Sequence, residues 1–238
     1  MYVLLDTNIV AAYYLPRCMH SKRAVKRITN LFDSVRSRQT DHFFYLPNFC
    51  VAEVFSVFMK YTFGSWNRHV KATGTIDTRV YKSLVEQFQD DIHNGRFIYH
   101  YELSRYHVLA MNLVAPIDHY FRISRGKRNV SPMRTFDHLI IAMGIHLAHI
   151  HGHENVVILS ADDRLTDILA KCKSGIRQTT IRKLKLEIAQ DITGRSFRPD
   201  IFPLHLNLTH ATEQDMRSVF ETWPLPVGTL PKVYRWLH

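Results

Sequence analysis

The chain begins with the stretch Tyr2-Val3-Leu4-Leu5-Asp6-Thr7-Asn8, which is the clearest indication of its fold class. Four consecutive apolar residues are typical of a short strand that is buried on both faces, as strands of parallel sheets are. The strand ends at an aspartate, and Thr7-Asn8 then predicts a helix that Pro16 ends. The chain therefore opens with a strand–helix unit that has an acid at its junction.

The same order of elements returns further along the chain. Phe43-Phe44-Tyr45-Leu46 is a second apolar run, and Pro47-Asn48 begins the next helix. Val156-Val157-Ile158-Leu159 is a third, and a helix follows Ser160-Ala161-Asp162. Alternating apolar strands and helices predict an α/β fold, a three-layer α/β/α sandwich with a mostly parallel central sheet.

The remaining elements are assigned from hydrophobic periodicity and turn residues. A basic helix over 21–38 is expected to bury one face, which consists of Ala24, Val25, Ile28, Leu31, Phe32 and Val35. Further helices are predicted over 81–94, 104–121, 136–150, 177–190 and 211–222, and short strands over 97–99 and 202–208. The tail from Trp223 contains three prolines and is expected to be irregular.

Composition narrows the class of protein. Apolar residues make up 46% of the 238 residues and charged residues 22%, which is ordinary globular composition and argues against disorder. The N-terminus lacks a basic leader, no apolar run reaches the roughly 20 residues that span a bilayer, and we expect no membrane association. The three cysteines are few and odd in number, which indicates free thiols and a cytoplasmic location.

The charge balance indicates a polyanionic partner. Lys and Arg total 31 against 21 acids, a net charge of +10. Clustered basic side chains gain affinity for nucleic acids because they release phosphate counterions. A merely basic protein is the alternative, and nucleic acid is the partner that we favour.

Four acids occupy positions where a parallel sheet would gather them. Asp6 and Asp162 follow apolar strands, and ligands of such sheets bind outside the carboxyl ends of the strands. Glu53 and Asp137 lie in the first turns of apolar helices, where a charge is costly unless it is paired or binds a metal. Helix starts lie at the same edge as strand ends. We therefore expect all four carboxylates to converge.

Converging carboxylates would repel one another without a cation. Hard oxygen ligands favour Mg²⁺ or Mn²⁺, and such a site suits hydrolysis of phosphodiesters. Each acid taken alone could instead have a purely structural role, since an aspartate at a helix start interacts favourably with the helix dipole. The joint placement of the four is what favours a metal-dependent nuclease.

These motifs resemble those of PIN-domain nucleases, in the same order. Leu4-Leu5-Asp6-Thr7-Asn8 is similar to the opening motif of that family, and Glu53 to its second acid. Asp137 in FDHLIIAMG resembles the third acid, which heads a helix of the form D-x-x-I-x-A. Ser160-Ala161-Asp162 is similar to the family's T-x-D step, with serine in place of threonine.

The resemblance covers residues 1–172 and implies a PIN-like domain with an insertion at about 64–130 and a C-terminal extension over 173–238. It implies a Mg²⁺- or Mn²⁺-dependent endoribonuclease that cleaves single-stranded RNA. Many such proteins are VapC-like toxins, so the resemblance also implies a toxin–antitoxin pair with an antitoxin partner, and a homodimer. The metal ligands and catalytic residues it implies are Asp6, Glu53, Asp137 and Asp162.

The chain departs from the family pattern after Asp162. The family's frequent acid two positions on is Arg164 here, and its following phenylalanine is Leu165. Asp163 is therefore the alternative to Asp162 as the residue that faces the metal. The chain is also much longer than a compact toxin, which weakens the toxin interpretation more than the nuclease interpretation.

Polar residues beside the acids are candidates for holding carboxylates or waters in place. Thr7, Asn8 and Ser160 have suitable hydroxyl and amide groups, and helix capping is the alternative role of Thr7 and Ser160. Contacts with RNA are predicted for basic residues of two loop-like segments, with solvated loops as the alternative: Arg68, Lys71, Arg125, Lys127, Arg128 and Arg134.

Other chemistries fit the sequence less well. Zinc binding by His146, His149, His151 and His153 is less expected than histidines that decorate a helix C-terminus. No phosphate-binding glycine-rich motif is present. Asn8 stands where an aspartyl phosphatase would have its second aspartate. Two functional alternatives remain: a catalytically silent PIN-like module that binds RNA or protein, and a structure-selective DNA nuclease.

Overall fold

The structure is a computed structural model, and it describes residues 1–63, 76–93, 95, 97–124, 131–173, 176–186 and 198–230. Its sheet contains five parallel strands in the order β3-β2-β1-β4-β5. In chain order the strands are Tyr2–Leu5, Phe43–Pro47, Ile98–Tyr101, Val156–Ser160 and Leu204–Asn207. Helices flank the sheet, which confirms the predicted α/β class.

The helices alternate with these strands along the chain. Their bounds are α1 Thr7–Tyr14, α2 Lys22–Arg36, α3 Asn48–Thr62, α4 Thr78–His93, α5 Arg105–Ser124, α6 Thr135–His151, α7 Asp163–Lys173, α8 Gln178–Lys183 and α10 Glu213–Phe220. Short 3-10 turns lie at Pro16–Cys18, His153–Asn155 and Pro199–Ile201. Among the described residues, no helix combines the length and the apolar character that a membrane crossing requires.

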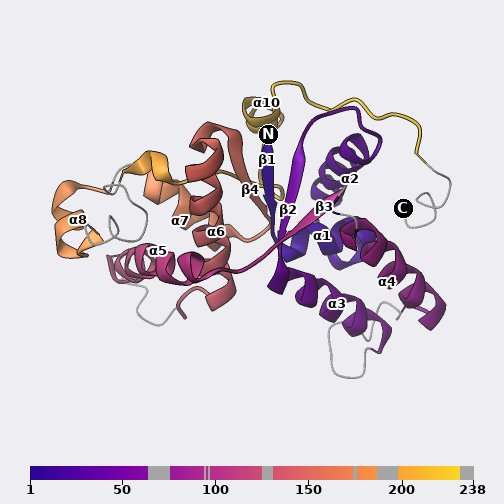
Figure 1. Cartoon of the computed structure of the whole chain (residues 1–238), viewed down its shortest axis with the longest axis horizontal. Helices are drawn as coiled ribbons and strands as arrows, with labels where there is room; N and C mark the ends of the chain where they lie inside the picture. Colours follow the sequence, from indigo (N-terminus) through magenta and orange to yellow (C-terminus); the bar gives the residue numbers. More distant parts are fainter. Residues whose placement is uncertain are drawn as a thin grey trace. The chain divides into compact units, whose positions relative to one another are not determined.

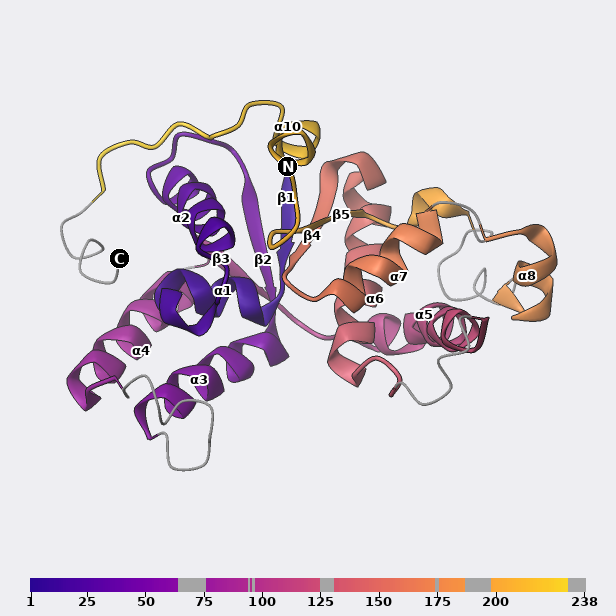
Figure 2. The same cartoon turned by 180° about the vertical axis from the view of Figure 1, so that it is seen from behind.

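The chain forms two compact units, which we describe separately. The α1–α4 unit consists of Leu5–Tyr101 and Leu208–His238. The α5–α7 unit consists of Met1–Leu4 and Glu102–Asn207. In Figure 1 the first four helices gather around β2 and β3, and Figure 2 shows α6 and α7 beside β4 and β5, with α5 packed on α6.

An aromatic core holds the α1–α4 unit together. Strands β2 and β3 pair in parallel, with Phe44 opposite Ile98, and both side chains are buried. The ring of Phe44 lies 4.7 Å from that of Phe32 on α2. Tyr14 at the end of α1 packs on Phe88 of α4 with the ring centroids 5.3 Å apart. Large buried rings contribute most of the apolar area that such a small unit removes from water.

The α5–α7 unit is built around β4 and α6. Every residue of Val156–Ser160 is buried, as expected for a central parallel strand. Helix α6 lies very close to this strand at Gly144, where an added Cβ would stand 2.6 Å from a Cδ1 of Ile158. The glycine in the middle of an apolar helix is therefore required by close packing on the sheet. Helix α6 ends at His151 and is followed by Gly152, whose φ of +88° suits a glycine.

The C-terminal segment of the α1–α4 unit is hydrogen-bonded to α2. The Arg27 guanidinium is buried and donates to the carbonyl oxygen of Leu208 at 3.2 Å and to Glu213 at 3.1 Å. The Asn30 side chain accepts from the N–H of Leu225 and donates to its carbonyl oxygen, both at 2.9 Å. Helix α10 begins with Thr212, whose hydroxyl accepts from the Asp215 N–H as a helix cap.

Three local predictions need correction. The buried face of α2 includes Arg27 and Ser34, whereas Val25 and Val35 are only half-buried, because contacts with the C-terminal segment bury the arginine. Helix α4 begins three residues earlier than expected, at Thr78. The charged helix predicted over 177–190 ends at Lys183 among the described residues, since Lys185 adopts a positive φ of 53°.

The predicted division of the chain at residue 172 stays a prediction. Segments on both sides of it contribute to the sheet: β4 pairs in parallel with β5, and Leu159 lies opposite Leu206. The expected irregular tail is observed from Trp223 to residue 230. The loop expected around 64–77 lies mostly outside the described residues.

Candidate active site

Asp6 and Glu53 form the first pair of candidate residues, in the α1–α4 unit. Asp6 lies between β1 and α1, and only 6% of its surface is exposed. The Asn8 amide donates to Asp6 Oδ2 at 2.7 Å. The Thr7 hydroxyl donates to Glu53 Oε2 at 2.5 Å, which joins the start of α1 to α3. Glu53 lies in the second turn of α3 and not in the first as expected, because the helix begins directly after Pro47. Thr7 and Asn8 therefore orient the two carboxylates.

Cys50 lies next to both acids, a relationship that the sequence motifs did not reveal. It is fully buried one turn before Glu53 on α3. Burial raises the pKa of its thiol well above the ordinary value, and the charges of Asp6 and Glu53 add to the increase. Because both carboxylates act on one thiol, they lie in the same small region of the unit. The thiol is kept neutral and serves as packing.

Asp137 and Asp162 form the second pair, in the α5–α7 unit. Asp137 lies in the first turn of α6, where its Oδ2 accepts from the backbone N–H of Arg134 at 3.2 Å. Asp162 precedes α7, and its Oδ1 accepts from the N–H groups of Arg164 at 2.7 Å and Leu165 at 3.3 Å. Both aspartates therefore cap helices. A capping carboxylate still has lone pairs for a cation, and among the described residues none donates to Oδ2 of Asp162.

The neighbours of Asp162 have different partners. The buried Ser160 hydroxyl accepts from the Asp162 N–H at 2.9 Å and so shapes the turn between β4 and α7. Asp163 Oδ1 accepts from the Asn207 amide of β5 at 2.6 Å. Asp163 thus joins α7 to the last strand, whereas Asp162 heads the helix. Which of the two aspartates faces a metal ion stays a prediction.

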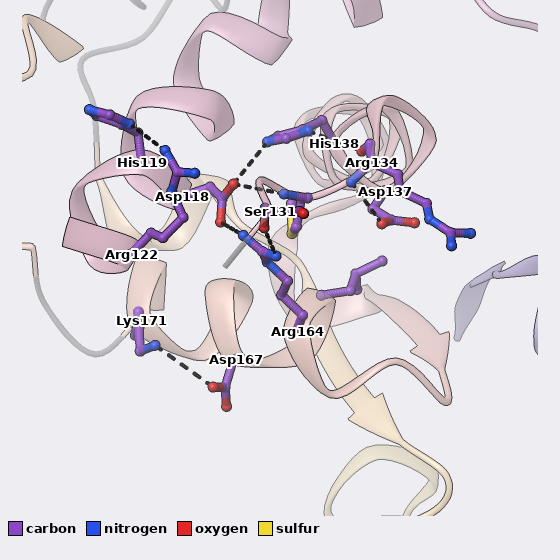
Figure 3. Close-up of polar contacts among 12 residues, drawn as sticks. Asp118, His119, Arg122, Ser131, Arg134, Asp137, His138, Arg164, Asp167 and Lys171 are labelled. Atoms are coloured by element: carbon purple, nitrogen blue, oxygen red, sulfur yellow. Dashed lines mark hydrogen bonds and ion pairs between the residues drawn. The ribbon is translucent and has the colours of Figure 1, made fainter. Parts of the chain in front are cut away.

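A buried cluster around Asp118 was not predicted from the sequence. Asp118 lies on α5 with 3% of its surface exposed. Its Oδ1 accepts from Arg164 Nη2 at 2.9 Å, and its Oδ2 accepts from the backbone N–H of Met133 at 3.0 Å (Figure 3). His138 Nε2 lies 3.8 Å from the same Oδ2. The one signal in the sequence was Arg164 itself, which stands where the family resemblance predicts an acid.

The histidines of α6 are engaged in packing. His107 Nδ1 accepts from the Ser104 N–H at 2.9 Å, so Nε2 is the protonated nitrogen of this ring. Nε2 donates to His146 Nδ1 at 3.0 Å. Burial, with His146 as a second contributor, lowers the pKa of His107 to about 4. His151 stacks on Tyr2 with ring centroids 3.6 Å apart, and His153 pairs with the neighbouring Glu154. These separate contacts favour the structural alternative over zinc binding.

The donor atoms of the four acids fit a hard divalent cation, because they are carboxylate oxygens. Each unit supplies two of these acids. Within the part of the chain that the structure describes, no three His, Cys, Asp or Glu side chains form a group that could hold a metal ion. The convergence of the two pairs on one ion therefore stays a prediction.

Most of the residues expected to bind RNA lie outside the described part of the chain: Arg68, Lys71, Arg125, Lys127 and Arg128. Arg134 is described, and it is an exposed residue directly before α6. Its backbone N–H binds Asp137, so it stands next to a candidate acid. Its role in RNA binding stays a prediction.

Comparisons with known proteins do not assign the chain to a family. No protein-family model matches the chain, and no curated protein matches it. A chain in the crystal structure of VapBC2 from Rickettsia felis bound to a DNA fragment from their promoter is similar in structure. That match has a TM-score of 0.40 and 14% sequence identity, and it covers 71% of this chain and 93% of the other. The resemblance to PIN-domain nucleases therefore depends on the motifs and the site.

Proposed function

We propose that this protein is a divalent-metal-dependent endoribonuclease that hydrolyses single-stranded RNA. The observation that carries the proposal is the oriented pair Asp6 and Glu53, which Asn8 and Thr7 hold at 2.7 and 2.5 Å at the carboxyl end of the first strand. An enzyme needs its metal ligands held in this way, because supporting hydrogen bonds fix both the orientation and the basicity of the ligands.

Each acid has a distinct part in the proposed reaction. Asp6, Asp137 and Asp162 would hold Mg²⁺ or Mn²⁺, and Glu53 would be a further ligand or the base that orients the attacking water. When bound, the metal supplies Lewis-acid polarisation of the phosphodiester and makes its water easier to deprotonate. Thr7 fixes the direction of the Glu53 carboxylate, which a base needs in order to accept a proton from water at a defined position.

The choice of RNA rests on the resemblance and on the net charge of +10. A polyanion gains binding energy from a basic surface whatever its sequence, and a single strand is the form that the family resemblance implies. The toxin role, an antitoxin partner, a homodimer and a cytoplasmic location stay predictions of the same resemblance and of the composition.

Cleavage assays test the proposal directly. Labelled single-stranded RNA, single-stranded DNA and a flapped duplex are incubated with the wild type in Mn²⁺ or EDTA, alongside Asp6→Asn and Glu53→Gln. We expect RNA cleavage that EDTA abolishes and that each variant reduces about 100-fold or more, since a metal contributes several kcal/mol to such a transition state. Asp77→Asn is the matched control, because Asp77 is an exposed acid of the same unit.

Two other outcomes would replace the proposal. RNA binding without cleavage by the wild type and by Asp6→Asn would identify a silent binding module. Cleavage confined to the flapped duplex would identify a structure-selective DNA nuclease. Cleavage that survives EDTA, or that Asp6→Asn leaves unchanged, would show that another site or a contaminant is responsible.

A further inference from the structure

Four hydrogen bonds, linked through Arg164 and the Met133–Arg134 peptide, join Asp162 to Asp137 within the α5–α7 unit. Asp162 Oδ1 accepts from the Arg164 backbone N–H at 2.7 Å, and the Arg164 guanidinium donates to Asp118 Oδ1 at 2.9 Å. Asp118 Oδ2 then accepts from the Met133 N–H at 3.0 Å. The next N–H, that of Arg134, donates to Asp137 at 3.2 Å. Asp118 is the middle of this path.

The Arg164 guanidinium makes a second hydrogen bond in the same region. Arg164 also donates to the carbonyl oxygen of Ser131, in the segment before α6. Figure 3 shows its guanidinium directed toward Asp118 and Ser131 together. A planar guanidinium has donors in a rigid fork and can satisfy two acceptors at once, which an ammonium does less well. One side chain of α7 therefore positions both α5 and the start of α6.

Burial makes the pairing obligatory. The Asp118 side chain is 4% exposed, and a carboxylate so far removed from water is stable only when it is paired and hydrogen-bonded. Arg164 is the cation that meets this need, with a side chain 30% exposed. The neighbouring His138 is anchored through Nδ1, which lies 3.1 Å from the Arg134 carbonyl oxygen. Arg164 and His138 therefore face the two oxygens of the Asp118 carboxylate, and Arg164 is the closer of the two.

We propose that Asp118 and Arg164 are positioning residues, which set the spacing of Asp137 and Asp162. This inference rests on the proposed function. Neither residue needs to contact the metal or the RNA. Their pairing fixes the two helix starts from which the acids project, and metal sites require their ligands to be held to within about 0.5 Å. The arginine that departs from the family pattern thus has a role of its own in this chain.

Two measurements on full-length protein test the inference, with Asp118→Asn as the main variant. The asparagine keeps the shape of the side chain but removes the charge that Arg164 needs. Asp91→Asn is the control: Asp91 of the α1–α4 unit forms an ion pair with Arg36 at 2.5 Å that is at least as buried, with both side chains 7% exposed. Arg164→Lys is a milder second variant, which keeps the charge but not the fork.

The first measurement is amide hydrogen exchange, which requires no metal. We expect Asp118→Asn to accelerate exchange together at Met133–Asp137 and at Arg164–Leu165, while Asp91→Asn accelerates neither segment. Acceleration at Met133 alone would overturn the inference, since it would mean that the path does not couple the two helix starts. Arg164→Lys should show the same joint response with a smaller amplitude.

The second measurement is the affinity for Mn²⁺, followed by the electron paramagnetic resonance of free Mn²⁺. Loss of a residue that positions a ligand typically weakens binding about 10- to 100-fold. We expect this weakening for Asp118→Asn, and less than a twofold change for Asp91→Asn. An unchanged affinity in Asp118→Asn, when Asp137→Asn abolishes binding, would overturn the inference. If the wild type binds no Mn²⁺, the proposed function fails, and hydrogen exchange alone decides whether the path exists.

Discussion

Asp118 Oδ1 lies 2.9 Å from Arg164 Nη2, and this ion pair joins α5 to the first turn of α7. Almost none of the Asp118 side chain is exposed, so its charge has no access to bulk water. Removing one partner of such a pair costs far more than the pair itself contributes, because the remaining charge stays buried. The pair therefore has consequences for stability that do not depend on any enzymatic role.

The first prediction concerns a double-mutant cycle on this pair. We expect Arg164→Ala to lower the free energy of unfolding by about 3 kcal/mol, since it leaves Asp118 buried without its cation. The double variant Asp118→Ala with Arg164→Ala should be less destabilised than the sum of the single variants by about 1–3 kcal/mol. Urea denaturation followed by circular dichroism measures each value. Simple additivity would contradict the predicted coupling.

The second prediction concerns pH and His107. The pKa of His107 in the folded protein is lowered from 6.5 to about 4. A lowered pKa in the folded state means that stability is present above the pKa of the unfolded chain and is lost as the pH falls. The contribution of His107 should therefore be complete above about pH 6.5 and decline toward pH 4.

The measurement is the free energy of unfolding at pH 7 and pH 5 for the wild type and for His107→Gln. The wild type should lose more stability between these values than the variant does. His119→Gln is the control, because His119 is exposed on the same helix. Equal losses in the wild type and in His107→Gln would show that His107 does not contribute to the pH dependence.

The third prediction concerns the segment after α10. Asn30 makes two hydrogen bonds to the backbone of Leu225, each 2.9 Å long. Asn30→Ala should lower the free energy of unfolding by about 1–2 kcal/mol and make the segment after Phe220 more sensitive to proteases. Limited proteolysis with mass spectrometry locates the cleavage. Lys22→Ala, at an exposed position at the start of α2, should change neither property.

The fourth prediction concerns Thr7 and depends on the proposed metal site. Thr7→Val keeps the shape of the side chain but removes the donor that reaches Glu53 at 2.5 Å. We expect the affinity for Mn²⁺ to fall about 10-fold or more. Thr62→Val is the matched control, since its hydroxyl donates at 2.8 Å to the Phe58 carbonyl oxygen of its own helix. A loss of affinity of the same size in both variants would point to a general effect of the missing hydroxyl.

Local patterns in the sequence were sufficient for the main elements of the fold. The apolar runs before Asp6 and Asp162 are strands, as short apolar runs that end at turn and helix-start signals predict. The helices after them begin where polar residues satisfy free N–H groups, as Asp162 does for α7. These are short-range effects, which neighbouring residues reveal.

Long-range contacts decided the rest. Arg27 is buried because Leu208 and Glu213, far along the chain, meet its guanidinium, and no periodicity within α2 predicts this. The same holds for Asp118, which is 46 residues from Arg164 and 15 from Met133. Neighbouring residues alone indicate which acids follow strands and begin helices. The pairings of Thr7 with Glu53 and of Arg164 with Asp118 depend on the folded chain, because the partners are 46 residues apart in both cases and meet only in space.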